Sequence, residues 1–212
     1  MEVVCLNNNV NSFPELGIEL ELPFYLRAIG YNEYTKKIDY PQGYIRHRIV
    51  IILDGDCILK AGTYTFHLHK NDAFFIRAHQ PFCYYASSEK CTTQWIVFDG
   101  YATIPLFSRL GLENYMIFHN LNTVNLSINL TQMYLTSINT DKASRLQNSA
   151  MTYKFLIDIY TQSEQGISAA EGKFENNSLL YAKRYIEQFY ATNLTQTEIA
   201  QSAGITPQHL CR

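Results

Sequence analysis

The segment from Phe24 to Tyr101 restricts the possible folds of this chain most strongly. The chain has 16 tyrosines, 12 phenylalanines and one tryptophan, and 16 of these 29 aromatic residues lie in that segment. Aromatic and β-branched residues form short runs there, separated by turn residues, which is typical of an antiparallel β-barrel or sandwich. The expected strands are 24–34, 44–53, 57–59, 63–68, 73–77, 82–86 and 92–99.

The pair Asp54-Gly55 stands between two apolar runs. A two-residue turn of type I′ needs positive φ angles, which Asp-Gly adopts at low cost. The sequence therefore predicts a hairpin that joins strands 44–53 and 57–59.

After Tyr101 the apolar period changes from two residues toward 3.6, which indicates helices. The recurring positions are Leu126, Leu130, Met133 and Tyr134, then Leu146, Ala150, Tyr153, Ile157 and Tyr160. Residues 139–142 would join two antiparallel helices within about 120–163. Such a pair can pack on the barrel or leave an apolar stripe for a second subunit, and we expect it to form a homodimer.

Composition sets the broad class. Hydrophobic residues make up 47% and charged residues 17%, which indicates a globular protein. No apolar run is long enough for a membrane helix and the start lacks a signal-peptide pattern, so we expect a cytoplasmic protein with no membrane partner. Five widely spaced cysteines without a C-x-x-C pair are expected to be reduced thiols.

Residues 178–212 read as a helix-turn-helix, after a polar linker at 164–177. Thr195 and Glu198 form a capping-box pattern, and Gly204 can end that helix. Thr206-Pro207 is a start signal for the next helix. Helices of this kind read the major groove. The expected DNA-binding residues are Thr195, Thr206, Gln208, Cys211 and Arg212. The net charge of −2 argues against a protein built wholly around nucleic-acid phosphates.

This C-terminal pattern closely resembles the AraC/XylS family of bacterial transcription regulators. The matching positions are Tyr190, Leu194, Thr195, Ile199, Ala200, Gly204, Thr206, Pro207, Leu210 and Arg212. DNA-binding domains of that family carry two helix-turn-helices, and this chain ends inside the recognition helix of the first. The resemblance implies a ligand-responsive regulator that binds DNA. The alternative is a truncated effector-sensing and dimerisation fragment without DNA binding.

The resemblance extends upstream to the cupin-type effector domain of such regulators, through Asp54-Gly55, Gly62-x-Tyr64-x-Phe66 and Gln94-Trp95. It implies a small-molecule effector, with a sugar or related polyol favoured, and no cofactor. Tyr84 and Trp95 occupy positions that hold the effector in sugar-responsive relatives, although Trp95 could equally be a core residue. The expected ligand-binding residues are Arg27, Arg46, His47, Arg48, Tyr84, Gln94 and Trp95.

A metal-dependent cupin enzyme is the alternative from another class. His67-Leu68-His69 puts two imidazoles on one side of a strand, as metal-binding cupins do. The Glu that such enzymes also need is absent, and Asp72 and His79 are the nearest substitutes. We therefore expect surface histidines, no metal and no enzymatic activity.

Together these patterns predict an α+β chain. Residues 1–163 form a cupin-like effector-binding and dimerisation domain, with the barrel at about 20–101 and the helices at about 120–163. Residues 164–177 form the linker, and 178–212 an incomplete all-α helix-turn-helix segment.

Overall fold

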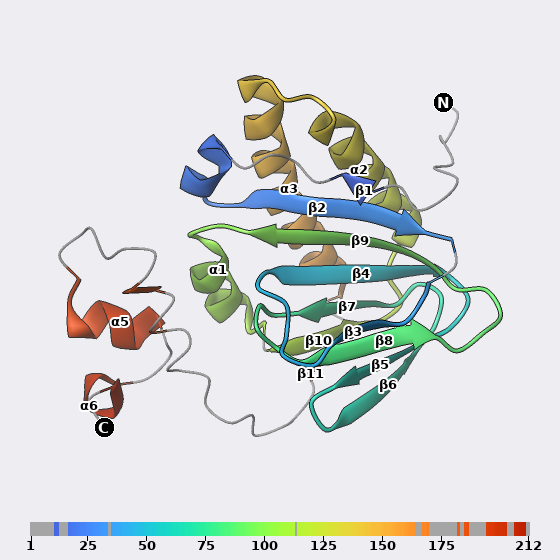
Figure 1. Ribbon diagram of the computed structural model, residues 1–212, viewed down its shortest axis with the longest axis horizontal. Coiled ribbons are helices and arrows are strands. Elements are labelled where there is room, and N and C mark those ends of the chain that lie inside the picture. The colour runs from blue at the N-terminus through green and yellow to red at the C-terminus, as the bar shows by residue number, and fades with distance from the viewer. Residues whose placement is uncertain are drawn as a thin grey trace. The chain divides into compact units, whose positions relative to one another are not determined.

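The computed structural model describes residues 11–12, 17–33, 35–112, 114–163, 167–169, 182, 185–186, 194–202 and 206–210. The chain divides into two compact units, residues 1–170 and 171–212. The first unit contains two antiparallel sheets and the helices that follow them (Figure 1).

The larger sheet has seven strands in the order β1-β2-β9-β4-β7-β10-β11. Their bounds are Asn11–Ser12, Tyr25–Asn32, Thr92–Asp99, His47–Asp54, Ala73–Ile76, Tyr115–Phe118 and Ile167–Ala169. The smaller sheet has the order β3-β8-β5-β6. Its bounds are Ile38–Tyr40, Phe82–Ala86, Cys57–Ala61 and Tyr64–Leu68. The seven strands expected from the sequence are all present, with ends within about three residues.

The hairpin expected at Asp54-Gly55 is wrong. β4 pairs with β7 and β9 in the larger sheet, whereas β5 pairs with β6 and β8 in the smaller one. Gly55 does have a positive φ of 77°, and a Cβ there would lie 1.9 Å from the carbonyl oxygen of Lys90. Asp54 does not have the positive φ that a type I′ turn also requires, and the turn carries the chain from one sheet to the other. The strands therefore form a sandwich-like pair of sheets.

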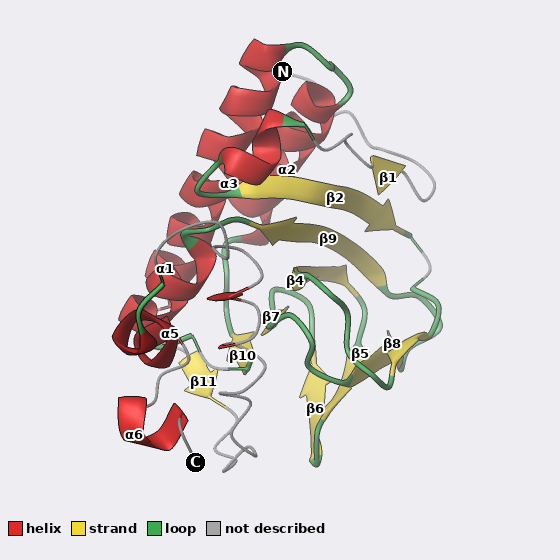
Figure 2. Cartoon of the chain, turned by 60° about the vertical axis from the view of Figure 1, so that its left-hand side comes forward, coloured by secondary structure: helices red, strands yellow, loops and turns green. Residues whose placement is uncertain are grey.

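The helices cover one face of the larger sheet, and the smaller sheet lies on its other side (Figure 2). The α-helices described in this unit are α1 (Thr103–Leu110), α2 (Thr123–Ser137) and α3 (Lys142–Ser163). A short 3₁₀ helix, η1, spans Ile18–Glu21 and contacts α3 through the ion pair between Glu19 Oε2 and Arg145 Nη1, at 3.2 Å. The first unit thus has three layers.

Strand alternation gives the larger sheet two buried faces. Ile49 of β4 and Phe98 of β9 share one hydrophobic cluster with Leu126 of α2 and Phe155 of α3. The residues between these positions along each strand, such as Val50, point the other way. They are equally buried but lie outside that cluster and face the smaller sheet. Arg48 and Trp95 belong to this second face, because Val50 pairs in register with Trp95.

The buried face of α3 differs from the face expected. Leu146 and Tyr153 are 43% and 45% exposed, whereas Phe155 and Ile159 are buried. The first half of the buried face is polar, and the Ser149 hydroxyl there donates to the carbonyl oxygen of Phe24. Apolar periodicity therefore pointed to the wrong face of this helix. For α2 the expected buried positions Leu126, Leu130 and Met133 are confirmed.

Six elements of the first unit that the structure describes were not expected from the sequence: β1, η1, β3, α1, β10 and β11. β10 pairs antiparallel with β7, and β11 pairs antiparallel with β10. β11 lies within 164–177, the range expected to be a linker. Short apolar runs such as Tyr115–Phe118 fit a strand and a buried helix equally well, so periodicity alone does not identify them.

The second unit contains α5 (Gln196–Ser202) and α6 (Pro207–Leu210). The capping box at the start of α5 is formed. The Glu198 amide donates to Thr195 Oγ1 at 3.2 Å, and the Thr195 amide donates to Glu198 Oε2 at 2.9 Å. The Thr195 amide and the Thr195 hydroxyl both donate to the Glu198 carboxylate and hold its pKa below the ordinary value. Gly204 lies outside the described residues.

Two further findings concern the described part of the chain. None of its helices combines the length and apolar character that crossing a bilayer requires. Cys57, Cys83 and Cys91 are free thiols.

Candidate functional site

Arg48 lies between the two sheets and is 7% exposed. It belongs to β4 of the larger sheet, and its Nη1 donates to the hydroxyl of Tyr84 on β8 of the smaller sheet, at 3.2 Å. Tyr84 is fully buried and packs edge-on against Phe74 of β7, with 5.1 Å between ring centroids. Arg48 and Tyr84 therefore meet in the space between the sheets.

Four aromatic rings surround the Arg48 guanidinium. Its Cζ lies 5.1 Å from the ring centroid of Trp95, 5.5 Å from Tyr44, 5.6 Å from Tyr40 and 5.9 Å from Phe82. These distances fall within the range of cation–π attraction. We call Arg48, Tyr84 and these four aromatic residues the Arg48 cage.

The Arg48 cage contains no negative charge. Within the described residues, Nε of Arg48 is buried without a hydrogen-bond partner, and no carboxylate lies within 4 Å of the guanidinium. Burial raises the pKa of the Tyr84 phenol, and the positive charge of Arg48 offsets only part of that effect. Tyr84 is thus a neutral phenol that accepts from Arg48 and still has its own proton to donate.

Trp95 forms one wall of this cage and is 7% exposed. Its ring nitrogen can donate to the Asn32 side-chain oxygen at 3.1 Å, once the Asn32 amide is oriented to satisfy both of its groups. The polar edge of the indole is then satisfied within the protein, and the ring face is turned to Arg48. Such a ring is suited to stacking against a flat ligand or a sugar.

His47 and Gln94 do not join the Arg48 cage. His47 neighbours Arg48 on β4 and therefore faces the helices, where its ring packs edge-on against Phe107 of α1, with centroids 4.8 Å apart. Its Nδ1 accepts the Ala78 amide at 3.0 Å. Gln94 pairs in register with Ile51, a residue of the helix-facing cluster, so it belongs to that face too.

Arg46 and Arg27 also lie apart from the cage. Arg46 precedes β4, and its Nη1 lies 3.4 Å from Asp99 Oδ2. Arg27 is half-buried and lies between Leu26 and Ala28 of β2, where the register of the pairing with β9 shifts by one residue. Of the seven ligand-binding residues expected from the sequence, the structure brings together Arg48, Tyr84 and Trp95.

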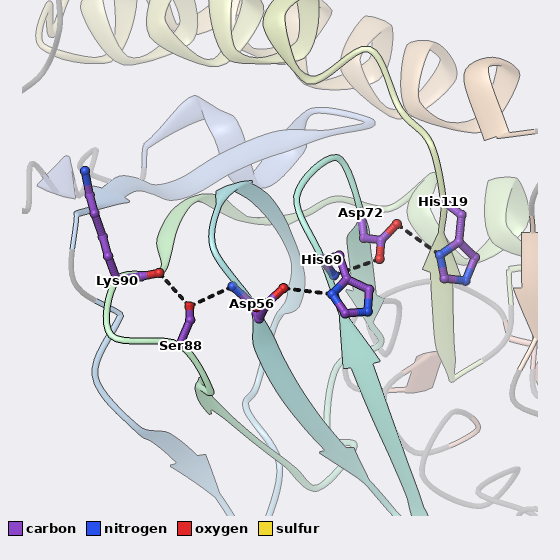
Figure 3. Close-up of polar contacts among 6 residues, drawn as sticks. All are labelled: Asp56, His69, Asp72, Ser88, Lys90 and His119. Carbon is purple, nitrogen blue, oxygen red and sulfur yellow. Dashed lines mark hydrogen bonds and ion pairs between the residues drawn. The ribbon is translucent and has the colours of Figure 1, made fainter.

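The two histidines of the His67-Leu68-His69 pattern are both exposed, but β6 ends at Leu68. His69 turns to Asp56, with 2.7 Å between Nδ1 and Oδ1, while Asp72 pairs with His119 at 3.0 Å (Figure 3). Among the residues that the structure describes, no three His, Cys, Asp or Glu side chains are close enough to hold one metal ion.

Of the expected DNA-binding residues, three are described. Thr195 caps α5, and Thr206 and Gln208 are exposed at the start of α6. Cys211 and Arg212 lie outside the described residues.

Sequence reasoning missed Tyr40, Tyr44 and Phe82. A usable signal existed for Phe82, because alternation along β8 puts Phe82 and Tyr84 on one face. Their rings are 6.2 Å apart and stacked. Tyr40 and Tyr44 reach Arg48 from β3 and from the loop that follows it, and no local pattern reports that contact.

Comparison with known proteins places this geometry in context. A family model described as the AraC-like ligand binding domain matches residues 34–156. Among solved structures, the AraC-like transcriptional activator CuxR has a TM-score of 0.50 and 14% identity, over 94% of this chain and 77% of that chain. At this identity the likeness shows the fold alone. No curated protein matches the chain in sequence.

Two other solved structures have lower scores. The apo form of ToxT K231A from Vibrio cholerae strain SCE256 has a TM-score of 0.48 and 12% identity, over 86% of this chain and 73% of that chain. A cupin superfamily protein from Desulfitobacterium hafniense has a TM-score of 0.32 and 12% identity, over 44% of this chain and 80% of that chain.

Proposed function

The chain belongs to the AraC-like ligand-binding domain family, and from this premise we propose that it is the sensor of a ligand-responsive transcription regulator that acts in the cytoplasm without catalysing a reaction. One observation carries the proposal: Arg48, Tyr84 and Trp95 come from three strands of two sheets and converge on one interior site. A rigid sheet scaffold with a few convergent polar groups among aromatic rings is typical of a small-molecule site.

The effector site is the Arg48 cage. The Trp95 ring can stack on the effector, while Tyr84 and Arg48 donate hydrogen bonds to it. These groups are compatible with the sugar or polyol suggested by the family resemblance. Arg27, Arg46, His47 and Gln94 are not assigned to this site, because their positions and contacts lie elsewhere.

DNA binding is assigned to the second unit. Support comes from the formed capping box of α5, from the start of α6 at Pro207 and from the exposure of Thr206 and Gln208. Glutamine and arginine side chains can form paired hydrogen bonds with base edges. Gln208 and Arg212 are the proposed base-reading residues, with Thr195, Thr206 and Cys211 beside the DNA.

Dimerisation is assigned to α2. Val124, Ile128, Leu135 and Ile138 are 67%, 44%, 43% and 58% exposed, although all four are apolar. Together with Thr131 they form a series of five positions, and the steps between successive positions are four, three, four and three residues. This is the spacing of the apolar positions in a coiled coil. We name these four residues the α2 stripe. A second copy of the chain is the proposed occupant.

A thermal-shift panel of sugars, polyols and organic acids tests the effector site. A ligand present at 100 times its Kd stabilises the folded state by about 2.7 kcal/mol, which raises Tm by several degrees. We expect at least one compound to shift the wild-type protein and not Trp95→Ala. Tyr101→Ala, which removes a 47% exposed ring elsewhere, is the control and should respond like the wild type. An equal shift in Trp95→Ala would contradict the assigned site.

A further inference from the structure

We propose that the effector carries a carboxylate and that Arg48 is the residue that binds it. The ligand class is a small organic acid with an apolar or ring-shaped body. This inference rests on the proposed function, because it concerns the same site.

The charge of Arg48 is the first reason. A guanidinium stays protonated under all conditions a folded protein meets. Transferring it from water to an interior is unfavourable unless it is paired with an opposite charge. Here 93% of the residue's surface is buried and the described surroundings supply one phenol and four ring faces. Ring faces attract a cation, but they do not replace a counter-ion.

Two partly buried arginines show how this chain pairs a guanidinium with a carboxylate. Arg46 pairs with Asp99 at 3.4 Å and Arg145 pairs with Glu19 at 3.2 Å. The side chains of Arg46 and Arg145 are 26% and 19% exposed, so both retain more solvent than Arg48. Arg48 is more deeply buried and yet lacks a carboxylate among the described residues, which suggests that the missing partner comes from outside the chain.

The donors in the cage favour an anion. Arg48 uses Nη1 for Tyr84, while its Nε is buried without a partner. The Tyr84 proton likewise has no acceptor among the described residues. All of these groups donate, and a carboxylate offers two oxygens that accept only. Arginine binds such a group through two parallel hydrogen bonds. A neutral hydroxyl would bring a further donor into a site that already has several.

The walls of the cage indicate the body of the ligand. Trp95 and Phe82 are buried, whereas Tyr40 and Tyr44 are only half-buried. The two tyrosines now lie over the guanidinium and over each other, with 5.1 Å between their ring centroids. They are the rings that can move aside for a ligand. The remaining walls are aromatic, so the carboxylate would be attached to an apolar group or a ring.

Fluorescence of Trp95 provides a direct measurement, because this is the one tryptophan of the chain and lies 5.1 Å from Arg48. Two matched pairs of probes differ in the carboxylate: benzoate against benzamide, which has an amide in its place, and galacturonate against galactose, which has a hydroxymethyl group there. We expect at least one acid to change the fluorescence saturably, with a Kd at least about tenfold lower than that of its neutral partner. That factor corresponds to the loss of a charge-assisted hydrogen bond.

Substitutions at Arg48 separate binding from folding. Arg48→Met should abolish binding of the acid, and Arg48→Lys should retain part of it, since lysine keeps the charge but not the paired donors. Arg109→Met, which removes an exposed arginine of α1, should bind as the wild type does. Because Arg48→Met also leaves the buried Tyr84 hydroxyl without its partner, a melting curve must show that the variant is folded, and Arg48→Lys tests binding if it is not.

Two results would overturn the proposal: neither acid binds, or Arg48→Met binds the acid unchanged. Equal binding of galactose and galacturonate would also overturn it. In that case, loss of the galactose-induced thermal shift in Trp95→Ala would leave the proposed effector site intact, and only the carboxylate would be wrong. Loss of the whole effector site would instead appear as an acid-induced thermal shift that Trp95→Ala leaves unchanged.

Discussion

Arg46 and Arg48 are two residues apart in the sequence, but their surroundings differ. Arg46 lies beside a carboxylate, whereas Arg48 lies among aromatic rings. Strand alternation predicts that they share a face. The structure begins β4 only at His47, and Arg46 turns to Asp99 instead. Arg48 continues into the interior and reaches Tyr84. The partners that separate the two arginines, Asp99 and Tyr84, are distant in sequence. The residues next to Arg46 therefore give no signal that predicts this separation.

A first prediction at this scale concerns His69 and Asp56. The hydrogen bond to Asp56 raises the pKa of the His69 imidazole above its ordinary value of 6.5. A pKa raised on folding means that the pair stabilises the fold fully below pH 6.5, and that this contribution is lost as pH rises through the folded-state pKa. An NMR titration of His69 should give a pKa above 6.5, and Asp56→Asn should lower it.

Asp54→Asn is the matched control for this measurement. Asp54 lies two residues from Asp56 and pairs with Lys70 at 3.4 Å, not with His69. The His69 titration should therefore change little in that variant. A His69 pKa that stays the same in Asp56→Asn would show that the short contact in Figure 3 does not control the imidazole.

At the scale of elements, α1 shows how a short helix depends on its packing. It spans eight residues and ends at Gly111, which has a φ of 65° and supplies the left-handed cap. A helix of this length is marginal by itself. Phe107 anchors it, since its ring is fully buried and lies 5.0 Å from Phe75 and 4.8 Å from His47, centroid to centroid.

We therefore predict that Phe107→Ala destabilises the protein by about 3–5 kcal/mol, the usual cost of removing a buried phenylalanine ring. Urea unfolding at constant pH measures it. Ser108→Ala, on the exposed side of the same helix, should change the free energy of unfolding by less than about 0.5 kcal/mol. A loss below about 1 kcal/mol for Phe107→Ala would mean that α1 contributes little to the core.

For the whole molecule, the α2 stripe should determine the oligomeric state. Ile128→Glu places a charge in the middle of the stripe, where burial in an interface without a partner charge is unfavourable. We predict that light scattering gives twice the chain mass of 24.5 kDa for the wild type and 24.5 kDa for Ile128→Glu. Gln147→Glu adds the same charge at an exposed position of α3, outside the stripe, and should remain dimeric. A wild-type protein that is monomeric at micromolar concentration would contradict the assignment.

The sequence by itself determined the features that depend on neighbours along the chain. The seven strands, the two long helices and the capping box of Thr195 and Glu198 follow from periodicity and cap chemistry, and the structure contains them. The sequence also determined that Gly55 adopts a positive φ. These are local preferences, and each is expressed within a few residues.

Only the tertiary structure decided which strands pair and which side chains meet. Asp54-Gly55 fits a hairpin locally, yet β4 pairs with β7 and β9 in one sheet and β5 pairs with β6 and β8 in the other. Ser149 lies on the buried face of α3 because the carbonyl of Phe24 is there to accept its hydroxyl. Arg48 obtains its aromatic surroundings from strands and a loop up to 47 residues away, with Trp95 at the far end. Such contacts depend on how the layers stack, and local periodicity carries no information about that.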